Sequence, residues 1–216
     1  MPLLRPKAVI FDCDGTLLDS EQCWLDMLNT LAVELRLPQN ALEGMRGVTA
    51  GFAARQLTRY SDLTEEAALD LINTRYSQSL SSVTCPLPGV RALLDSLHGR
   101  IPLAVATNGR SEDVSKMLYQ AGIEHYFDTL ATVEDVKHGK PNPEIYRYAC
   151  RRLNVAPSDA VVLEDSIVGA RAASDAGCTI VGLRLPPVSF PLINADSLFD
   201  ISYAPRTGSL AIHSPG

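Results

Sequence analysis

The chain has 216 residues, of which 46% are hydrophobic and 20% are charged, and its formal net charge is −6. This composition is typical of a soluble globular protein, and no apolar run approaches the ~20 residues of a membrane-spanning helix. The acidic balance, without a basic run or interleaved aromatic residues, argues against nucleic acid as a partner.

The first seven residues lack the apolar core of a signal peptide and lead directly into an apolar run, which predicts a strand at 7–12. We therefore expect a cytoplasmic protein with no membrane partner. The five cysteines are odd in number and form no CxxC pair, so we expect reduced thiols rather than disulfides or a zinc site.

Two carboxylates close this first strand. Asp12 and Asp14 are two residues apart, so both side chains point the same way, and Gly15 lets the chain turn away at once. Two unit charges about 4 Å apart repel by roughly 4 kcal/mol at an effective dielectric of about 20, and a divalent cation is the usual way to neutralise them. The pattern predicts a metal-assisted site in which a carboxylate can act as nucleophile or base.

The next segment reads as helical and shows no strand-like alternation. Residues 21–36 and 64–80 each place large apolar side chains on one stripe. We expect 19–86 to form a small all-helical domain, with the core domain built from 1–18 and 87–216.

After this insert, strands alternate with helices, which is the signature of a parallel sheet with helices on both faces. The predicted fold is therefore α/β, with a Rossmann-like core and a helical cap. The expected strands are 7–12, 102–107, 128–132, 160–164 and 179–184. The expected helices are 89–98, a segment from the N-cap Ser111 to Gly122, 143–153 with Asn142 as N-cap and Pro143 at its first position, and 167–176.

Polar residues also follow the strands at 102–107 and 160–164, and a lysine precedes the helix at 143–153. The carboxyl ends of parallel strands meet at one edge of a sheet, where ligands bind, and a helix N-terminus favours an anion. The candidate site therefore gathers Asp12, Asp14, Thr107, Lys140, Glu164 and Asp165.

The pattern weakens after Leu185. Residues 196–201 have the composition of a short element, and 205–216 read as a loose tail. We therefore expect deletion of 206–216 to leave activity intact.

Four segments occur in a fixed order along the chain: Asp12-Cys13-Asp14-Gly15-Thr16, Thr107-Asn108-Gly109, Gly139-Lys140-Pro141-Asn142-Pro143 and Leu163-Glu164-Asp165-Ser166. Together they resemble the four motifs of the haloacid dehalogenase-like phosphohydrolases. The resemblance covers about 7–185. The helical insert is similar to the cap domain of that family, which closes over the site and selects the substrate.

The resemblance implies a phosphoric monoester hydrolase that works in two steps. Asp12 would attack phosphorus and form an aspartyl-phosphate, and Asp14 would protonate the leaving oxygen and then activate water. The phosphoryl group would be bound by Thr107, Lys140 and the main-chain N–H groups near Cys13, Asp14 and Asn108. Mg²⁺ would be held by Asp12, the main-chain carbonyl of Asp14, and Asp165, with Glu164 in or near the coordination shell.

Arg46, in the glycine-containing loop 44–49, is our candidate for substrate recognition because it is a positive point on the cap. The stretch 11–21 most resembles bacterial sugar-phosphate phosphatases, including 6-phosphogluconate phosphatase-like members. Phosphoglycolate phosphatase and β-phosphoglucomutase are also related types. We expect a monomer that acts on a small phosphomonoester, with a sugar phosphate as the first candidate and a glycolate-sized phosphate as the second.

Two alternatives stay open. The sugar-phosphate mutases of the family carry an extra catalytic histidine around the position of Trp24, whereas this chain has no histidine between residues 1 and 97, which favours hydrolysis. A non-catalytic phospho-accepting or binding module is the other alternative. The complete set of motifs argues against it.

Overall fold

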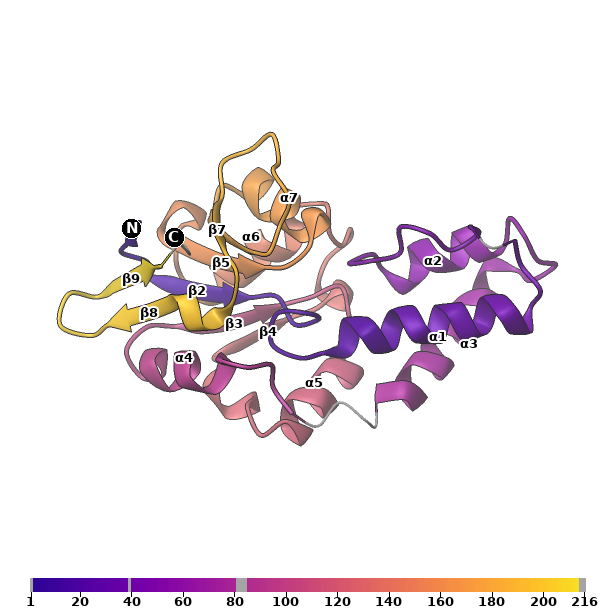
Figure 1. Ribbon diagram of the computed structural model, residues 1–216, viewed down its shortest axis with the longest axis horizontal. Coiled ribbons are helices and arrows are strands. Elements are labelled where there is room, and N and C mark those ends of the chain that lie inside the picture. The colour runs from indigo at the N-terminus through magenta and orange to yellow at the C-terminus, as the bar shows by residue number, and fades with distance from the viewer. Residues whose placement is uncertain (1, 39, 81–84, 214–216) are drawn as a thin grey trace.

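The computed structural model describes residues 2–38, 40–80 and 85–213. Within them, three helices lie together at one end of the molecule, and a sheet with the other helices lies at the opposite end (Figure 1). None of the helices in these ranges combines the length and the apolar character needed to cross a bilayer.

The main sheet has six strands in the order β4-β3-β2-β5-β6-β7, and neighbouring strands pair in parallel. This result confirms the predicted α/β fold and its five strands, and it adds a sixth strand at one edge. The strands are β2 (Ala8–Phe11), β3 (Leu103–Ala106), β4 (Thr129–Ala131), β5 (Ala160–Glu164), β6 (Thr179–Leu183) and β7 (Ile193–Ala195).

Hydrophobic clusters cover both faces of this sheet. Val9 and Phe11 pack in the cluster beneath α4 (Val90–Leu97) and α5 (Ser111–Gln120), whereas Ile10 packs in the cluster beneath α6 (Glu144–Arg152) and α7 (Ile167–Ala176). The alternation follows from the strand itself, because successive side chains point to opposite faces. Burial on both faces also explains why the strand sequences are almost continuously apolar.

The predicted helices of this part form, but two of their first residues differ from the prediction. Ser111 is the first residue of α5 rather than its N-cap, which is Arg110, and the free Ser111 N–H at this helix end donates to the Glu134 carboxylate at 2.9 Å. Pro143 occupies the cap position of α6, and the Asn142 side chain accepts from the Glu144 N–H. Short 3₁₀ turns lie at Glu124–Tyr126, Val133–Asp135, Pro157–Asp159 and Leu198–Asp200.

The remaining helices are α1 (Ser20–Glu34), α2 (Ala50–Leu57) and α3 (Glu65–Ser79), which share a hydrophobic cluster of their own. We call them the helical unit. The side chains of Thr49 and Thr64 cap α2 and α3 by accepting a backbone N–H, as is usual for threonine at this position. Trp24 lies inside the cluster and donates its indole N–H to the Met45 carbonyl.

The expectation of a loose tail is wrong for the last described strand. β8 (Ile201–Ala204) and β9 (Ser209–Ile212) form a hairpin, and β9 also pairs with β1 (Leu3–Leu4) near the start of the chain (Figure 1). Leu210 and Ile212 are fully buried in the cluster under α4 and α5. The expected tolerance of a deletion of 206–216 therefore no longer follows. Residues 214–216 lie outside the described residues.

Candidate active site

Asp12 and Lys140 form a buried ion pair at the carboxyl edge of the main sheet. Asp12 directly follows β2, and Lys140 lies in the loop before α6. The Lys140 ammonium donates to Asp12 Oδ1 at 2.5 Å and to Glu164 Oε1 at 2.6 Å. Only 2% of the Lys140 side chain is exposed. The positive charge of Lys140 is therefore held in a fixed position beside the Asp12 carboxylate.

Glu164, the last residue of β5, holds this lysine in place. Its Oε1 also accepts from the Tyr146 hydroxyl at 2.6 Å, and its Oε2 accepts from the backbone N–H and the hydroxyl of Ser166. Gly169 of α7 lies so close that a Cβ there would come within 1.7 Å of Oε1. Both oxygens of this fully buried carboxylate are thus engaged by protein donors.

Three carboxylates offer a candidate metal centre. Ligand oxygens of Asp12, Glu164 and Asp165 all lie within 4.8 Å of one another. Gly15 makes room for Asp165, since a Cβ there would come within 2.2 Å of Oδ2, and its φ of +80° suits glycine. Three acidic groups beside one lysine leave an excess of negative charge, and oxygen donors suit Mg²⁺. The residues therefore fit a hard divalent cation.

Asp14 lies apart from this cluster and is held by hydroxyl groups. Its Oδ1 accepts from Ser20 at 2.5 Å and from Tyr76 at 3.1 Å, and its Oδ2 accepts from Thr107 at 3.1 Å. Ser20 begins α1, Tyr76 belongs to α3, and Thr107 follows β3. The carboxylate therefore sits at the junction of the helical unit and the sheet. Its main-chain carbonyl stays a predicted metal ligand.

Sequence reasoning missed Tyr76 as a neighbour of Asp14, and it did not assign Ser20 to this carboxylate. The helical periodicity of 64–80 places Tyr76 on an apolar stripe, and this pattern gives no signal for the direction of a hydroxyl. Ser20 follows the first motif closely enough to read as part of a helix N-terminus.

Asn108 connects three segments through its side chain. The carboxamide nitrogen donates to the carbonyls of Gly47 and Lys140, and the carboxamide oxygen accepts from the Lys140 N–H at 2.8 Å. The side chain is thus occupied by backbone groups, and the main-chain N–H of Asn108 stays its predicted phosphoryl contact.

Arg46 lies beside the acidic cluster, with Nη1 3.7 Å from Asp165 Oδ2 and half of its side chain exposed. Nearby, the buried Glu21 accepts the Gly47 N–H at 3.1 Å and so fixes the loop that carries Arg46.

A cavity of about 60 Å³ lies between the helical unit and the sheet. Among the described residues, Arg46 is not part of the wall of this cavity. It lines a neighbouring groove on the other side of Asp165. The wall includes Asp12, Asp14, Glu21, Trp24, Asn73, Tyr76, Asn108, Arg110, Lys140 and Asp165.

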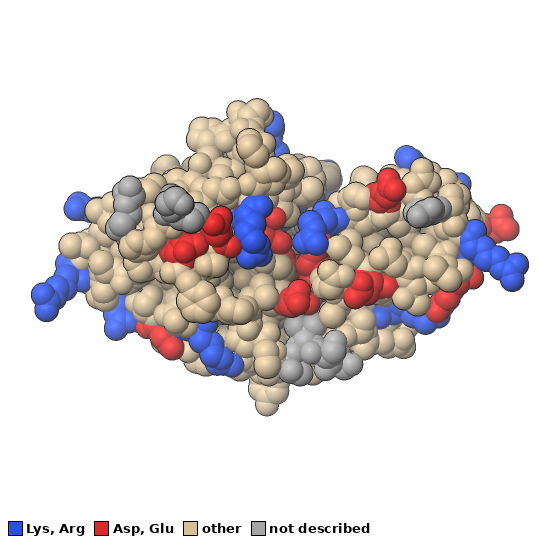
Figure 2. Space-filling model, in the orientation of Figure 1, with Lys and Arg blue, Asp and Glu red and all other residues tan. Residues whose placement is uncertain are grey.

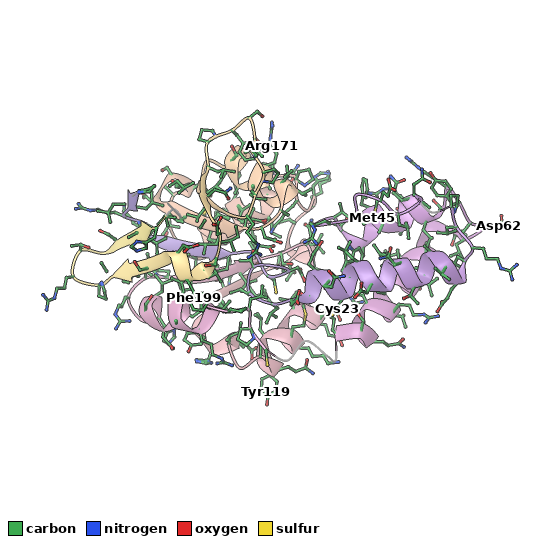
Figure 3. All side chains as sticks on the ribbon, in the orientation of Figure 1. Cys23, Met45, Asp62, Tyr119, Arg171 and Phe199 are labelled. Atoms are coloured by element: carbon green, nitrogen blue, oxygen red, sulfur yellow. The ribbon has the colours of Figure 1, made fainter. Side chains whose placement is uncertain are left out.

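The charged side chains at the surface also gather near this cavity. Figure 2 shows basic and acidic side chains gathered where the two parts of the molecule meet. In Figure 3, Cys23 and Met45 mark the end of the helical unit that faces the sheet, whereas Asp62 marks its far end.

Burial dominates the electrostatics of the site. It raises the pKa of Asp12 well above its ordinary value, although the Lys140 charge acts against it. Burial, reinforced by the Glu164 charge, raises the pKa of Asp165 to about 7, and burial together with Asp14 raises the pKa of Glu21 to about 7. For Lys140, burial lowers the pKa, but contact with the two carboxylates outweighs burial and raises it, so the lysine stays charged.

Comparison with known proteins gives a consistent match. The sequence profile of haloacid dehalogenase-like hydrolases matches residues 9–183. The chain is 34% identical over 188 residues to the fructose-1-phosphate phosphatase YqaB of Escherichia coli, covering 84% of this chain and 98% of that protein. It is 34% identical over 178 residues to a phosphorylated carbohydrates phosphatase of Thermotoga maritima, covering 79% and 82%.

A solved structure supports the same assignment. CbbY from Rhodobacter sphaeroides, crystallised with phosphate, is similar with a TM-score of 0.74 and 27% identity, over 89% of this chain and 95% of that chain.

Proposed function

This chain belongs to the haloacid dehalogenase-like hydrolase family and is a phosphoric monoester hydrolase, and we propose that it is a Mg²⁺-dependent phosphatase of small sugar phosphates. The proposal includes an aspartyl-phosphate intermediate. One observation carries it: two carboxylates two residues apart occupy different surroundings, Asp12 against the Lys140 ammonium and Asp14 among hydroxyl groups. Such a division suits one nucleophile and one proton carrier.

Asp12 is the proposed nucleophile. An oxygen of its carboxylate attacks phosphorus, the bond from phosphorus to the leaving oxygen breaks, and the phosphoryl group remains on Asp12. Lys140 provides positive charge at the place where the phosphoryl oxygens gather, and Thr107 lies close enough to bind one of them. Catalysis then depends mainly on positioning and charge stabilisation.

Mg²⁺ would be held by Asp12, Asp165 and the main-chain carbonyl of Asp14, and it would supply further positive charge to the phosphoryl oxygens. Glu164 was predicted in or near this shell. Because its two oxygens already accept four hydrogen bonds from the protein, we assign it chiefly to holding Lys140.

Asp14 is the proposed general acid and base. It gives a proton to the leaving oxygen, and as a carboxylate it then takes a proton from the water that attacks the aspartyl-phosphate. The alcohol and inorganic phosphate are the products.

The segment 19–86 is the proposed cap, with 1–18 and 87–216 as the core. Three contacts support closure of one over the other: Asn108 with Gly47, Asp14 with Tyr76, and Asp113 with Ser77. Arg46 remains the proposed contact to the part of the substrate that is not transferred. The monomeric state and the cytoplasmic location stay predictions.

Hydrolysis is favoured over the mutase reaction by the position of Trp24. There, where the related mutases carry a histidine, the indole N–H donates to the Met45 carbonyl and the ring packs edge-on against Tyr76. An indole cannot exchange a proton as the mutase histidine does.

The test is phosphate release from a panel of sugar phosphates, phosphoglycolate and nucleotides, with and without Mg²⁺. We expect Mg²⁺-dependent release that is lost in Asp12→Asn and kept in the control Asp159→Asn, whose carboxylate pairs with Lys7 at the surface. Release that persists in Asp12→Asn would reject the nucleophile. Release from none of the compounds would turn attention to the mutase reaction with a bisphosphate primer.

A further inference from the structure

The carboxylate of Asp14 is oriented by hydroxyl groups from both parts of the molecule. Thr107 comes from the end of β3, whereas Ser20 and Tyr76 come from the helical unit. Tyr76 belongs to α3 of the helical unit, so its hydroxyl reaches Asp14 only when α3 packs against the sheet.

The direction of the Tyr76 hydroxyl is fixed by the packing of its ring. The ring meets Trp24 edge-on, with 5.2 Å between centroids and 84° between planes. It also contacts both the cluster inside the helical unit and the cluster under α4 and α5. A phenol held on two sides in this way has little freedom except to donate to Asp14 Oδ1.

The geometry points to Tyr76 as a positioning residue that holds Asp14 in line for proton transfer when the helical unit is closed over the sheet. This inference rests on the proposed function, because it requires Asp14 to be the acid and base. Tyr76 itself exchanges no proton with the substrate.

The proton transfer in the first step shows which substrates depend on the orientation of Asp14. In the first step the O–H bond of the Asp14 carboxyl breaks, and its proton passes to the leaving oxygen as that oxygen takes the electron pair of the P–O bond. An alcohol is a poor leaving group and needs this proton, whereas 2,4-dinitrophenolate leaves without it. A misoriented Asp14 should therefore slow alkyl phosphates and spare the aryl phosphate.

The test is the Tyr76→Phe variant, which keeps the ring and removes only the hydroxyl. We would measure single-turnover release of the leaving group, with Mg²⁺, from the best sugar phosphate of the panel and from 2,4-dinitrophenyl phosphate. General acid catalysis is worth about 10²–10⁴-fold. Partial loss of alignment should slow the sugar phosphate at least ~10-fold while the aryl phosphate changes less than ~2-fold, with KM for the sugar phosphate nearly unchanged.

Ser77→Ala is the matched control. Ser77 is the next residue of α3 and also joins the two parts of the molecule, through Asp113 at 2.5 Å and Arg110 at 3.2 Å. Loss of this contact should change both substrates by the same factor.

An equal loss on both substrates in Tyr76→Phe, an effect on KM alone, or no effect would overturn the inference. Failure of the proposed function looks different, because either the parent chain would release phosphate from none of the compounds or Asp12→Asn would still release it.

Discussion

Replacing Lys140 by methionine would leave two buried carboxylates without their cation. The ammonium is 2.5 Å from Asp12 and 2.6 Å from Glu164, whose side chains are 9% and 0% exposed. Methionine is unbranched and flexible, so the change removes the charge and fills much of the space. Activity should be lost because the proposed phosphoryl site loses its fixed positive charge.

The expected loss of stability can be bounded from these distances. At an effective dielectric of about 20, unit charges ~2.6 Å apart attract by roughly 6 kcal/mol. Dehydration of each ion costs several kcal/mol, and removal of one partner from a buried pair costs about 3–5 kcal/mol in total. In a chain of this size, that loss corresponds to a fall of about 6–20 °C in Tm.

The loss should depend on pH. Burial raises the pKa of Asp12 and Lys140 acts against it, so the pKa rises further in Lys140→Met. A carboxyl whose pKa is raised by folding binds its proton more tightly in the folded state, and the folded variant loses stability as pH increases through that range. The deficit should therefore be larger at pH 8 than at pH 5.

The measurement is urea unfolding in EDTA at both pH values. The control is Lys7→Met, which removes an exposed pair with Asp159 and should change the free energy of unfolding by less than ~1 kcal/mol. A Lys140→Met variant within ~1 kcal/mol of the parent at pH 8, or a deficit that does not shrink at pH 5, would refute the reasoning.

Three further outcomes are expected. Leu210→Ala should lower the free energy of unfolding by about 2–5 kcal/mol in urea, because the side chain is fully buried; a change below ~1 kcal/mol would return β9 to the status of a dispensable tail. Gly169→Ala should reduce kcat at least ~10-fold, since its Cβ would displace the Glu164 carboxylate, whereas Gly51→Ala, whose Cβ would meet no side-chain atom closer than 3.9 Å, should not. Mg²⁺ affinity, measured by titration calorimetry, should fall about tenfold per pH unit below pH 7, because the proton on Asp165 competes with the metal. Constant affinity from pH 5.5 to 8 would contradict that assignment.

The core of the fold was predictable because the apolar segments of the sequence are the ones that are buried in the sheet. Strands such as Ala160–Glu164 are buried on both faces, so each residue is apolar until the strand reaches the edge that carries Glu164 and Asp165. Parallel topology then brings the ends of distant strands together without further information from the sequence.

The hairpin near the end of the chain was missed for the opposite reason. Ser209–Ile212 is short, contains a serine and an alanine, and depends on a partner about two hundred positions earlier, Leu3–Leu4. No local sequence pattern predicts a pairing between segments so far apart. The two prolines at 186–187 also make the segment before β7 look like a loop, so β7 was not predicted.

The contacts within the site were only partly accessible to sequence reasoning. Residue types identify carboxylates and a lysine, but not which oxygen accepts which proton. That Glu164 is occupied by Tyr146 and Ser166, or that Asn108 is occupied by backbone groups, depends on how helices pack on the sheet. The first fact gives Glu164 a structural role beside its predicted metal contact, and the second leaves the main-chain N–H of Asn108 as its predicted phosphoryl contact.

The pairing of Leu3 with Ala211 also orders the events of synthesis. The proposed catalytic residues are all translated once the ribosome has passed Asp165, but among the described strands β1 pairs only with β9 and must wait until β9 emerges. During that interval the first strand keeps an unpaired edge, which is a target for association with other nascent chains. Once β9 pairs between β1 and β8, the first and last described strands of the chain are hydrogen-bonded to each other. Neither β1 nor β9 can then unfold without breaking the hydrogen bonds that join the two strands.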